Sequence, residues 1–175
     1  MALREILTEP NKILREKSVN VDIVNKDIQI LMDDMLETMY AAPGIGLAAI
    51  QVGVPKRIIV MDLSRDEKER APMFFINPKI TWKADEDSTY EEGCLSVPNQ
   101  FAKIDRPKNC NVNYLDYFGE PKTLVAEGLL ATCIQHEMDH LEGILFIDYL
   151  SKLKKSMIIK KLSKNKKENV DRIVV

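Results

Sequence analysis

Apolar side chains recur every three or four residues along 26–40, where the sequence reads KDIQILMDDMLETMY. Positions 28, 31, 32, 35, 36 and 39 are all Ile, Leu or Met, so they share one face of a helix. Pro43 and Gly44 follow, and both residues interrupt helical structure. The pattern therefore predicts an amphipathic N-terminal helix whose methionine-rich face lies on the core.

Short runs of β-prone residues occupy the middle of the chain. We expect strands over 57–63, 73–80, 101–104, 109–117 and 123–127. The charged stretch 64–70 separates the first two runs, and Pro, Asn and Gly bound the others. Apolar and polar residues alternate over 110–114, which indicates a strand with one buried face and one wet face.

Two further helices are expected in the C-terminal part. The first starts near Gly128 and runs through LLATCIQHEMDHLE to Gly143, a residue type that commonly ends helices. The second spans 150–162. Its apolar side is expected to comprise Leu150, Leu153, Met157, Ile158 and Leu162.

This order of elements predicts an α+β fold, with antiparallel β-sheets packed around the central helix that carries residues 136–140. The length of 175 residues suits a single catalytic domain over 1–175. Residues 151–175 would form a basic C-terminal helix and tail. They hold nine Lys or Arg against two Asp or Glu, a formal charge of +7 that leaves −9 for the rest.

Composition narrows the classes of protein that fit. The net charge of −2 provides no overall attraction to nucleic acid, so we expect no specific nucleic-acid readout. The three cysteines cannot all pair within one chain, and no run approaches the roughly 18 apolar residues that span a bilayer. No apolar signal segment follows Met1. We therefore expect a cytoplasmic protein without membrane attachment, whose thiols are ligands or core residues.

Residues 136–140 read His-Glu-Met-Asp-His, and the chain has no other histidine. Residues four apart on a helix lie one above the other, so His136 and His140 can reach the same ion. Glu137 projects to the side, where it can accept a proton from a water on that ion. The alternative is a solvated helix with two incidental histidines, and the shared spacing with an adjacent Glu favours the metal site.

A catalytic ion needs a third protein ligand and an open position. Phe146 stands where one class of HExxH peptidase has a third histidine, and Glu168, the distant carboxylate candidate, lies in the lysine-rich tail. Cysteine remains. Cys133 shares the helix with both histidines, which strains a tetrahedral arrangement, and Cys110 lies in a strand interior. Spacing therefore favours Cys94 and leaves Cys133 as the second candidate.

Three segments together resemble the bacterial peptide deformylases: GIGLAAIQ at 44–51, EGCLS at 92–96 and QHEMDH at 135–140. The likeness extends from residues 7–10 to about residue 151. The resemblance implies that Cys94, His136 and His140 hold one divalent ion, natively Fe²⁺, with Zn²⁺ or Ni²⁺ able to replace it. It also implies that Glu92 and Arg106 form an ion pair behind the cysteine loop.

The reaction that the resemblance implies is removal of the formyl group from N-formylmethionine of nascent polypeptides. A metal-bound water attacks the formyl carbon, and Glu137 serves as general base and then general acid, so that formate is released. The Gln51 side-chain amide and the Leu95 backbone N–H stabilise the oxyanion. The residues expected to contact the substrate are Ile45, Gly46, Leu129, Thr132 and Cys133.

Two regions depart from the family pattern or are individual. Asn99 and Phe101 stand where members often carry an acidic residue and then an Arg, so preference beyond methionine is left open. The basic C-terminal helix is either a solvated face or a site of ribosome docking. The lysines concerned are Lys152, Lys154, Lys155, Lys160, Lys161 and Lys164.

Two other functions compete with the formyl-removing hydrolase. An HExxH metallopeptidase would cleave unformylated peptides without releasing formate. A non-catalytic protein with a structural zinc site would hold its ion without any need for Glu137. Replacing that glutamate therefore discriminates between an enzyme and a structural site.

Overall fold

Three helices and seven strands make up the regular structure of residues 1–164, the part of the chain that the computed structural model describes. The helices are α1 (Lys26–Ala41), α2 (Gly128–Leu141) and α3 (Lys152–Lys164). The strands are β1 (Gly46–Ala48), β2 (Ile58–Met61), β3 (Met73–Lys83), β4 (Asp87–Cys94), β5 (Val97–Pro107), β6 (Asn109–Leu115) and β7 (Pro121–Glu127). Short 3₁₀ helices are η1 (Lys12–Arg15), η2 (Ala49–Val52), η3 (Glu67–Glu69) and η4 (Phe146–Tyr149).

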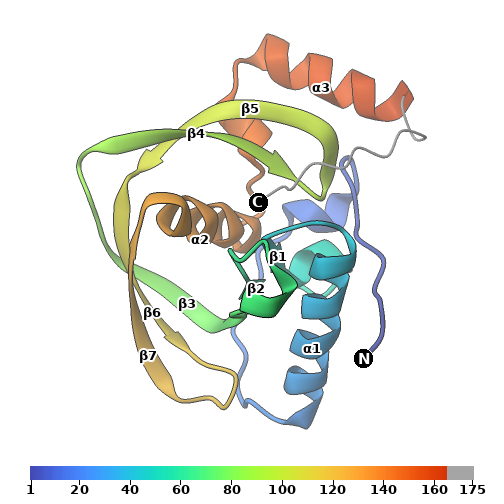
Figure 1. The fold of residues 1–175 in the computed structure, drawn as a ribbon. Coiled ribbons are helices and arrows are strands. Elements are labelled where there is room, and N and C mark those ends of the chain that lie inside the picture. Colours follow the sequence, from blue (N-terminus) through green and yellow to red (C-terminus); the bar gives the residue numbers. More distant parts are fainter. Residues whose placement is uncertain (165–175) are drawn as a thin grey trace.

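The strands form two antiparallel sheets around α2. The larger sheet has the order β1-β2-β3-β6-β7, and β4 pairs with β5 in a separate two-stranded sheet. Figure 1 shows α2 lying between the β4–β5 ribbon and the larger sheet. Ile134 and Cys133 of α2 pack with Phe75 and Val112 of the larger sheet in one buried cluster. The predicted α+β fold with antiparallel sheets is confirmed.

Helix α1 follows the predicted pattern. The Asn25 side chain accepts a hydrogen bond from the Ile28 backbone N–H at 3.1 Å, which caps the first turn. Leu31, Met32 and Met35 are buried among residues of β1 and β2. The methionine-rich face therefore fills the core on this side of the sheet.

The strand boundaries differ from the expectation in the second sheet. Strand β4 was not expected, and β5 runs over Val97–Pro107 rather than 101–104. The first five residues of β4 alternate between exposed and half-buried, so hydrophobic periodicity is weak there. Its pairing with β5 stabilises it, as each residue of 87–93 faces a partner in 101–107.

The prediction of the apolar side of α3 was wrong in part. Ile158 is buried and packs with Leu150 and Leu162 against β5 and η4, but Leu153 and Met157 are 72% and 50% exposed. The helix contacts the body of the protein along one narrow edge, so only part of its apolar side is covered. Residues 165–175, including Glu168 and the predicted tail, lie outside the described residues. No helix of residues 1–164 combines the length and apolarity needed to cross a bilayer.

Candidate metal centre

Three donor side chains converge from two elements. Cys94 ends β4, directly before the turn at 95–96 and at a register shift in the β4–β5 pairing. His136 and His140 lie on successive turns of α2, with ring centroids 5.1 Å apart. One ligand atom from each of the three residues lies within 4.8 Å of the others, and Cys94 Sγ is 3.3 Å from His140 Nε2. All three side chains are buried.

The chemistry of this cluster fits a transition-metal ion. One sulfur and two imidazole nitrogens are donors that Zn²⁺ and Fe²⁺ accept. His136 Nε2 is buried and has no hydrogen-bond partner within residues 1–164, as is true of both Glu137 carboxylate oxygens. Buried polar atoms rarely remain unpaired, so these atoms are placed to bind a ligand.

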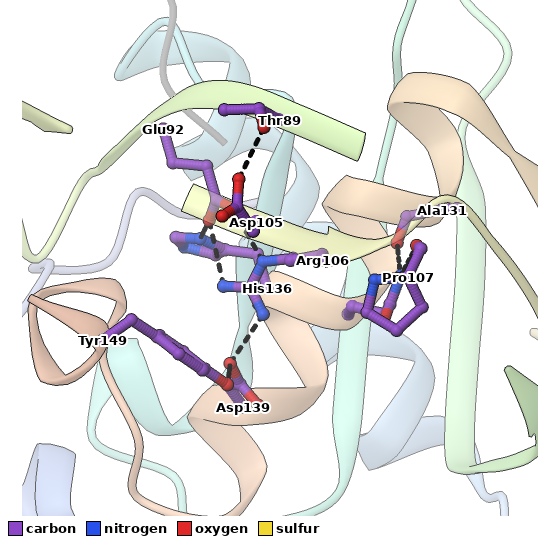
Figure 2. A network of polar contacts seen from close by, with 10 residues as sticks. Thr89, Glu92, Asp105, Arg106, Pro107, Ala131, His136, Asp139 and Tyr149 are labelled. Carbon is purple, nitrogen blue, oxygen red and sulfur yellow. Dashed lines mark hydrogen bonds and ion pairs between the residues drawn. The ribbon is translucent and has the colours of Figure 1, made fainter. Parts of the chain in front are cut away.

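The orientation of the His136 imidazole is fixed at its second ring nitrogen, Nδ1. His136 Nδ1 lies 2.7 Å from Glu92 Oε1, which favours the tautomer with a proton on Nδ1 and a lone pair on Nε2. Glu92 also accepts two bonds from Arg106, 2.7 Å from Nε to Oε2 and 3.0 Å from Nη2 to Oε1. Figure 2 shows this arrangement, in which the expected Glu92–Arg106 pair lies directly behind the imidazole.

The two histidines differ in electrostatic environment. Burial and the neighbouring His136 lower the pKa of His140 well below its ordinary value, so its imidazole is neutral. Burial also opposes the charged form of His136, but the neighbouring Cys94 and Glu92 outweigh this and raise its pKa to about 10.

Glu137 lies completely buried beside the donor cluster. Burial raises the pKa of its carboxyl to about 7, against the lowering effect of His136. Its carboxylate packs on Gly46 of β1, where an added Cβ would lie 2.5 Å from Oε1. A carboxyl poised near neutral pH in a buried site is suited to accepting and returning a proton.

Gln51 presents its amide nitrogen to the cysteine loop. Its Oε1 accepts the Ala48 backbone N–H at 2.9 Å, which fixes the amide orientation. Its Nε2 then faces Cys94 Sγ at 3.5 Å and donates to Ser96 Oγ at 3.0 Å. Leu95 lies in the turn between these two residues. Both groups expected to stabilise an oxyanion therefore lie next to the cluster.

The expected substrate residues gather around the N-terminal half of α2 and the start of β1. Ile45 and Cys133 share the buried cluster, with Cys133 Sγ 4.0 Å from the Ile45 carbonyl oxygen. Leu129 is half-buried, and Thr132 is buried with no partner for its hydroxyl within residues 1–164. Cys133 stands outside the donor cluster, whose sulfur comes from Cys94.

Several residues that contact the candidate centre or its partners were not predicted from the sequence. Asp139 accepts hydrogen bonds from both Arg106 and Tyr149, and Ser96 accepts one from Gln51. Phe146, considered only as a failed ligand position, lies with its ring 6.2 Å from that of His136. The position of Asp139, one turn beyond His136, is the signal that could have revealed its proximity to the site.

The amino-acid sequence is similar to those of known proteins over most of its length. The family described as polypeptide deformylase matches residues 3–156. A peptide deformylase of Pelagibacter ubique is 68% identical over 170 residues, 97% of this chain and 99% of that protein. A peptide deformylase of Phenylobacterium zucineum is 58% identical over 167 residues, 95% of this chain and 99% of that protein.

Solved structures agree with the sequence relatives. The structure of peptide deformylase from Ehrlichia chaffeensis in complex with actinonin matches with a TM-score of 0.91 and 45% identity, over 96% of this chain and 100% of that one. The match to the family extends over most of the chain and includes every residue of the candidate centre. The chain therefore belongs to the polypeptide deformylase family of enzymes.

Proposed function

We propose that this enzyme hydrolyses the formyl group of N-formylmethionyl peptides, releasing formate and a free amino terminus. The observation that carries the proposal is the convergence of Cys94, His136 and His140 beside the buried carboxylate of Glu137. The names of the relatives support the substrate class. New polypeptides carry the formyl group as they leave the ribosome, so we propose that the enzyme acts in the cytoplasm.

Each residue of the centre has a distinct proposed role. Cys94, His136 and His140 hold one divalent ion, which when bound lowers the pKa of a water molecule and polarises the formyl carbonyl. Glu137 accepts the proton of the attacking water and later gives it to the leaving amine. The Gln51 Nε2–H and the Leu95 N–H donate to the oxygen that becomes negative. The products are then formate and the amine.

We propose Fe²⁺ as the native ion, with Zn²⁺ or Ni²⁺ as replacements. A set of one thiolate and two imidazoles accepts all three ions. The thiolate ligand also exposes an iron enzyme to oxidative damage. Anaerobic purification followed by elemental analysis tests the identity of the ion. Zinc as the main metal under those conditions would contradict the iron assignment.

The methionine side chain is proposed to lie against Ile45, Gly46 and the N-terminal part of α2, where Leu129, Thr132 and Cys133 lie. Ile45, Leu129 and Cys133 belong to one apolar cluster, and Gly46 packs on the carboxylate of Glu137, an arrangement that suits an unbranched thioether side chain beside the centre. Formyl-Met and formyl-Ser peptides provide the test. A strong preference for formyl-Met in kcat/KM is expected, and equal values for both would contradict the assignment.

A formate-release assay on a formyl-Met peptide tests the reaction itself. Wild-type enzyme is expected to release one formate per peptide and to leave the unformylated peptide intact. Glu137→Ala is expected to keep its metal while losing turnover about 10²- to 10⁴-fold. Cleavage of unformylated peptides without formate would identify a peptidase. Retention of full turnover by Glu137→Ala would contradict the assigned role.

The basic face of α3 is proposed to dock on the ribosome. Lys152, Lys154 and Lys161 are exposed on this helix, and a polyanionic surface attracts such a face in a salt-dependent manner. Co-sedimentation with ribosomes at low and high salt tests the proposal. Association that is absent, or that does not respond to salt, would contradict it.

A further inference from the structure

Arg106 joins two carboxylates behind the donor cluster. Its guanidinium forms the two-bond contact with Glu92 and also donates from Nη1 to Asp139 Oδ2 at 2.8 Å. The Arg106 and Glu92 side chains are 5% and 0% exposed, whereas Asp139 is 20% exposed. A planar guanidinium is oriented by every carboxylate that it pairs with. Asp139 therefore fixes the side of Arg106 that faces away from Glu92.

Tyr149 completes this arrangement from η4. Its hydroxyl donates to the same Asp139 oxygen at 2.7 Å, and its ring lies 5.0 Å from the Arg106 guanidinium carbon. Figure 2 shows Tyr149 at one end of a continuous set of contacts whose other end is His136. The ring of Tyr149 is thus placed for a cation–π contact while its hydroxyl holds the carboxylate.

Solvent approaches the outer end of this set of contacts. A cleft of about 320 Å³ is bordered by Arg106, Asp139 and Tyr149, and Tyr149 is itself 51% exposed. Water in the cleft competes for Arg106 and Asp139, and the two contacts of Tyr149 oppose that competition. Without Asp139 or Tyr149, the Arg106 fork has more freedom to rotate. Rotation would release Glu92 from the position in which it meets His136 Nδ1.

We propose that Asp139 and Tyr149 are positioning residues for the metal-binding imidazole of His136, acting through Arg106 and Glu92. The proposal rests on the proposed function, because it assigns His136 as a ligand of the catalytic ion. Partners of a metal-bound histidine typically change metal affinity about 10- to 100-fold when replaced. Asp139 and Tyr149 extend that effect to residues that contact neither the ion nor the imidazole.

Zinc titration of the full-length, metal-stripped protein tests the proposal. We expect Asp139→Asn to weaken Zn²⁺ binding about 10-fold or more. Tyr149→Phe should weaken it about three- to tenfold, which is less than the loss expected from replacing a residue that contacts the histidine itself. Tyr117→Phe is the matched control, since Tyr117 donates at 3.0 Å to Asp33 outside these contacts. The control should bind Zn²⁺ within about twofold of wild type.

A spectroscopic readout separates positioning from general destabilisation. In the zinc-loaded protein, the NMR resonance of the His136 Nδ1 proton is expected to shift in Tyr149→Phe and to stay in place in Tyr117→Phe. Unchanged zinc affinity in Tyr149→Phe, or an equal loss in Tyr117→Phe, would overturn the role of Tyr149. Should Asp139→Asn fail to fold, Tyr149→Phe alone decides.

Formate release is measured separately on the same variants. A wild-type enzyme that releases no formate, with zinc affinity still reduced in Tyr149→Phe, would overturn the proposed function and support the positioning role. An active wild-type enzyme, with zinc affinity unchanged in both variants, would overturn the positioning role and leave the proposed function intact. The two failures therefore give different results.

Discussion

At the scale of single residues, the packing of Glu137 on Gly46 defines how close β1 and α2 approach. A Cβ at position 46 would lie 2.5 Å from Glu137 Oε1 and 2.9 Å from its Cδ, closer than heavy atoms can pack. The glycine is therefore required by the carboxylate that it contacts. Gly44 has a different close neighbour, since a Cβ there would lie 2.7 Å from Cδ1 of Leu95.

Replacing this glycine should disturb the reaction more than the fold. We expect Gly46→Ala to displace the Glu137 carboxylate and to lower kcat about 100-fold, as a misplacement of about 1 Å typically does. The metal content should stay near that of wild type, since the three atoms nearest to an added Cβ all belong to Glu137 and none to a metal-binding residue. Steady-state kinetics and elemental analysis check both points. Full activity in Gly46→Ala would show that the carboxylate works from another position.

The two cysteines near the centre should respond differently to replacement. Cys94→Ser removes the only sulfur in the donor cluster of residues 1–164, so we expect the purified protein to lose most of its metal. Cys133→Ser places a hydroxyl among apolar residues of the core, which lowers stability but leaves the three donors in place. Elemental analysis of both variants is the measurement. Equal metal loss would contradict the choice of Cys94.

At the scale of elements, periodicity and turn residues located α1, α2 and four of the five strands of the larger sheet, namely β2, β3, β6 and β7. The signal was strongest in α1, where the buried residues, among them Leu31, Met32 and Met35, share one continuous face. Strand β1 could not be found in this way, because its three residues are all buried and too few to show a period. Strand β4 depends on its pairing with β5, a long-range contact that local patterns do not contain.

The residues of the site could likewise be predicted only where a local pattern or a family motif connects them. The spacing of His136 and His140 on one helix predicted them as ligands. Spacing favoured Cys94 and family resemblance agreed with it, whereas Gln51 came from the resemblance alone. Tyr149 lies ten residues beyond Asp139, across the end of α2 and in a different element. No sequence period connects such a pair, so only the folded chain brings them together. The exposed positions of Leu153 and Met157 on α3 likewise depend on where the helix docks.

The end of α2 provides a prediction about stability. Gly143 has φ of +75°, and an added Cβ would overlap the Arg15 backbone carbonyl. We expect Gly143→Ala to lower the free energy of unfolding by about 2 kcal/mol or more, from left-handed strain plus this overlap. Denaturant unfolding measures the loss. Gly143→Asn relieves the left-handed strain, because Asn tolerates a positive φ, but it keeps the overlapping Cβ. A free energy of unfolding close to that of wild type in this variant would therefore contradict the overlap with Arg15.

At the scale of the whole molecule, the centre joins parts that are distant in the sequence. Gln51 comes from η2, Cys94 from β4, and the two histidines from α2. These elements meet only when both sheets have closed around α2. An ion that binds all three donors therefore binds the folded chain and not the unfolded one.

Metal removal should accordingly lower the stability of the entire fold. At free metal 100 times above its dissociation constant, linkage predicts about 2.7 kcal/mol of added stability. We expect a chelator to lower the midpoint of thermal unfolding of the wild type, and readdition of Zn²⁺ to restore it. Cys94→Ser should unfold at the same temperature with or without the chelator. A chelator-dependent shift in that variant would mean that the ion binds elsewhere.

X-ray absorption at the zinc edge of the zinc-loaded enzyme tests the central claim most directly. The claim is that Cys94, His136 and His140 hold one ion together. The spectrum should contain one sulfur at about 2.3 Å and two imidazole nitrogens at about 2.0–2.1 Å, and the sulfur should disappear in any metal retained by Cys94→Ser. A metal shell without sulfur in the wild-type enzyme would contradict the account.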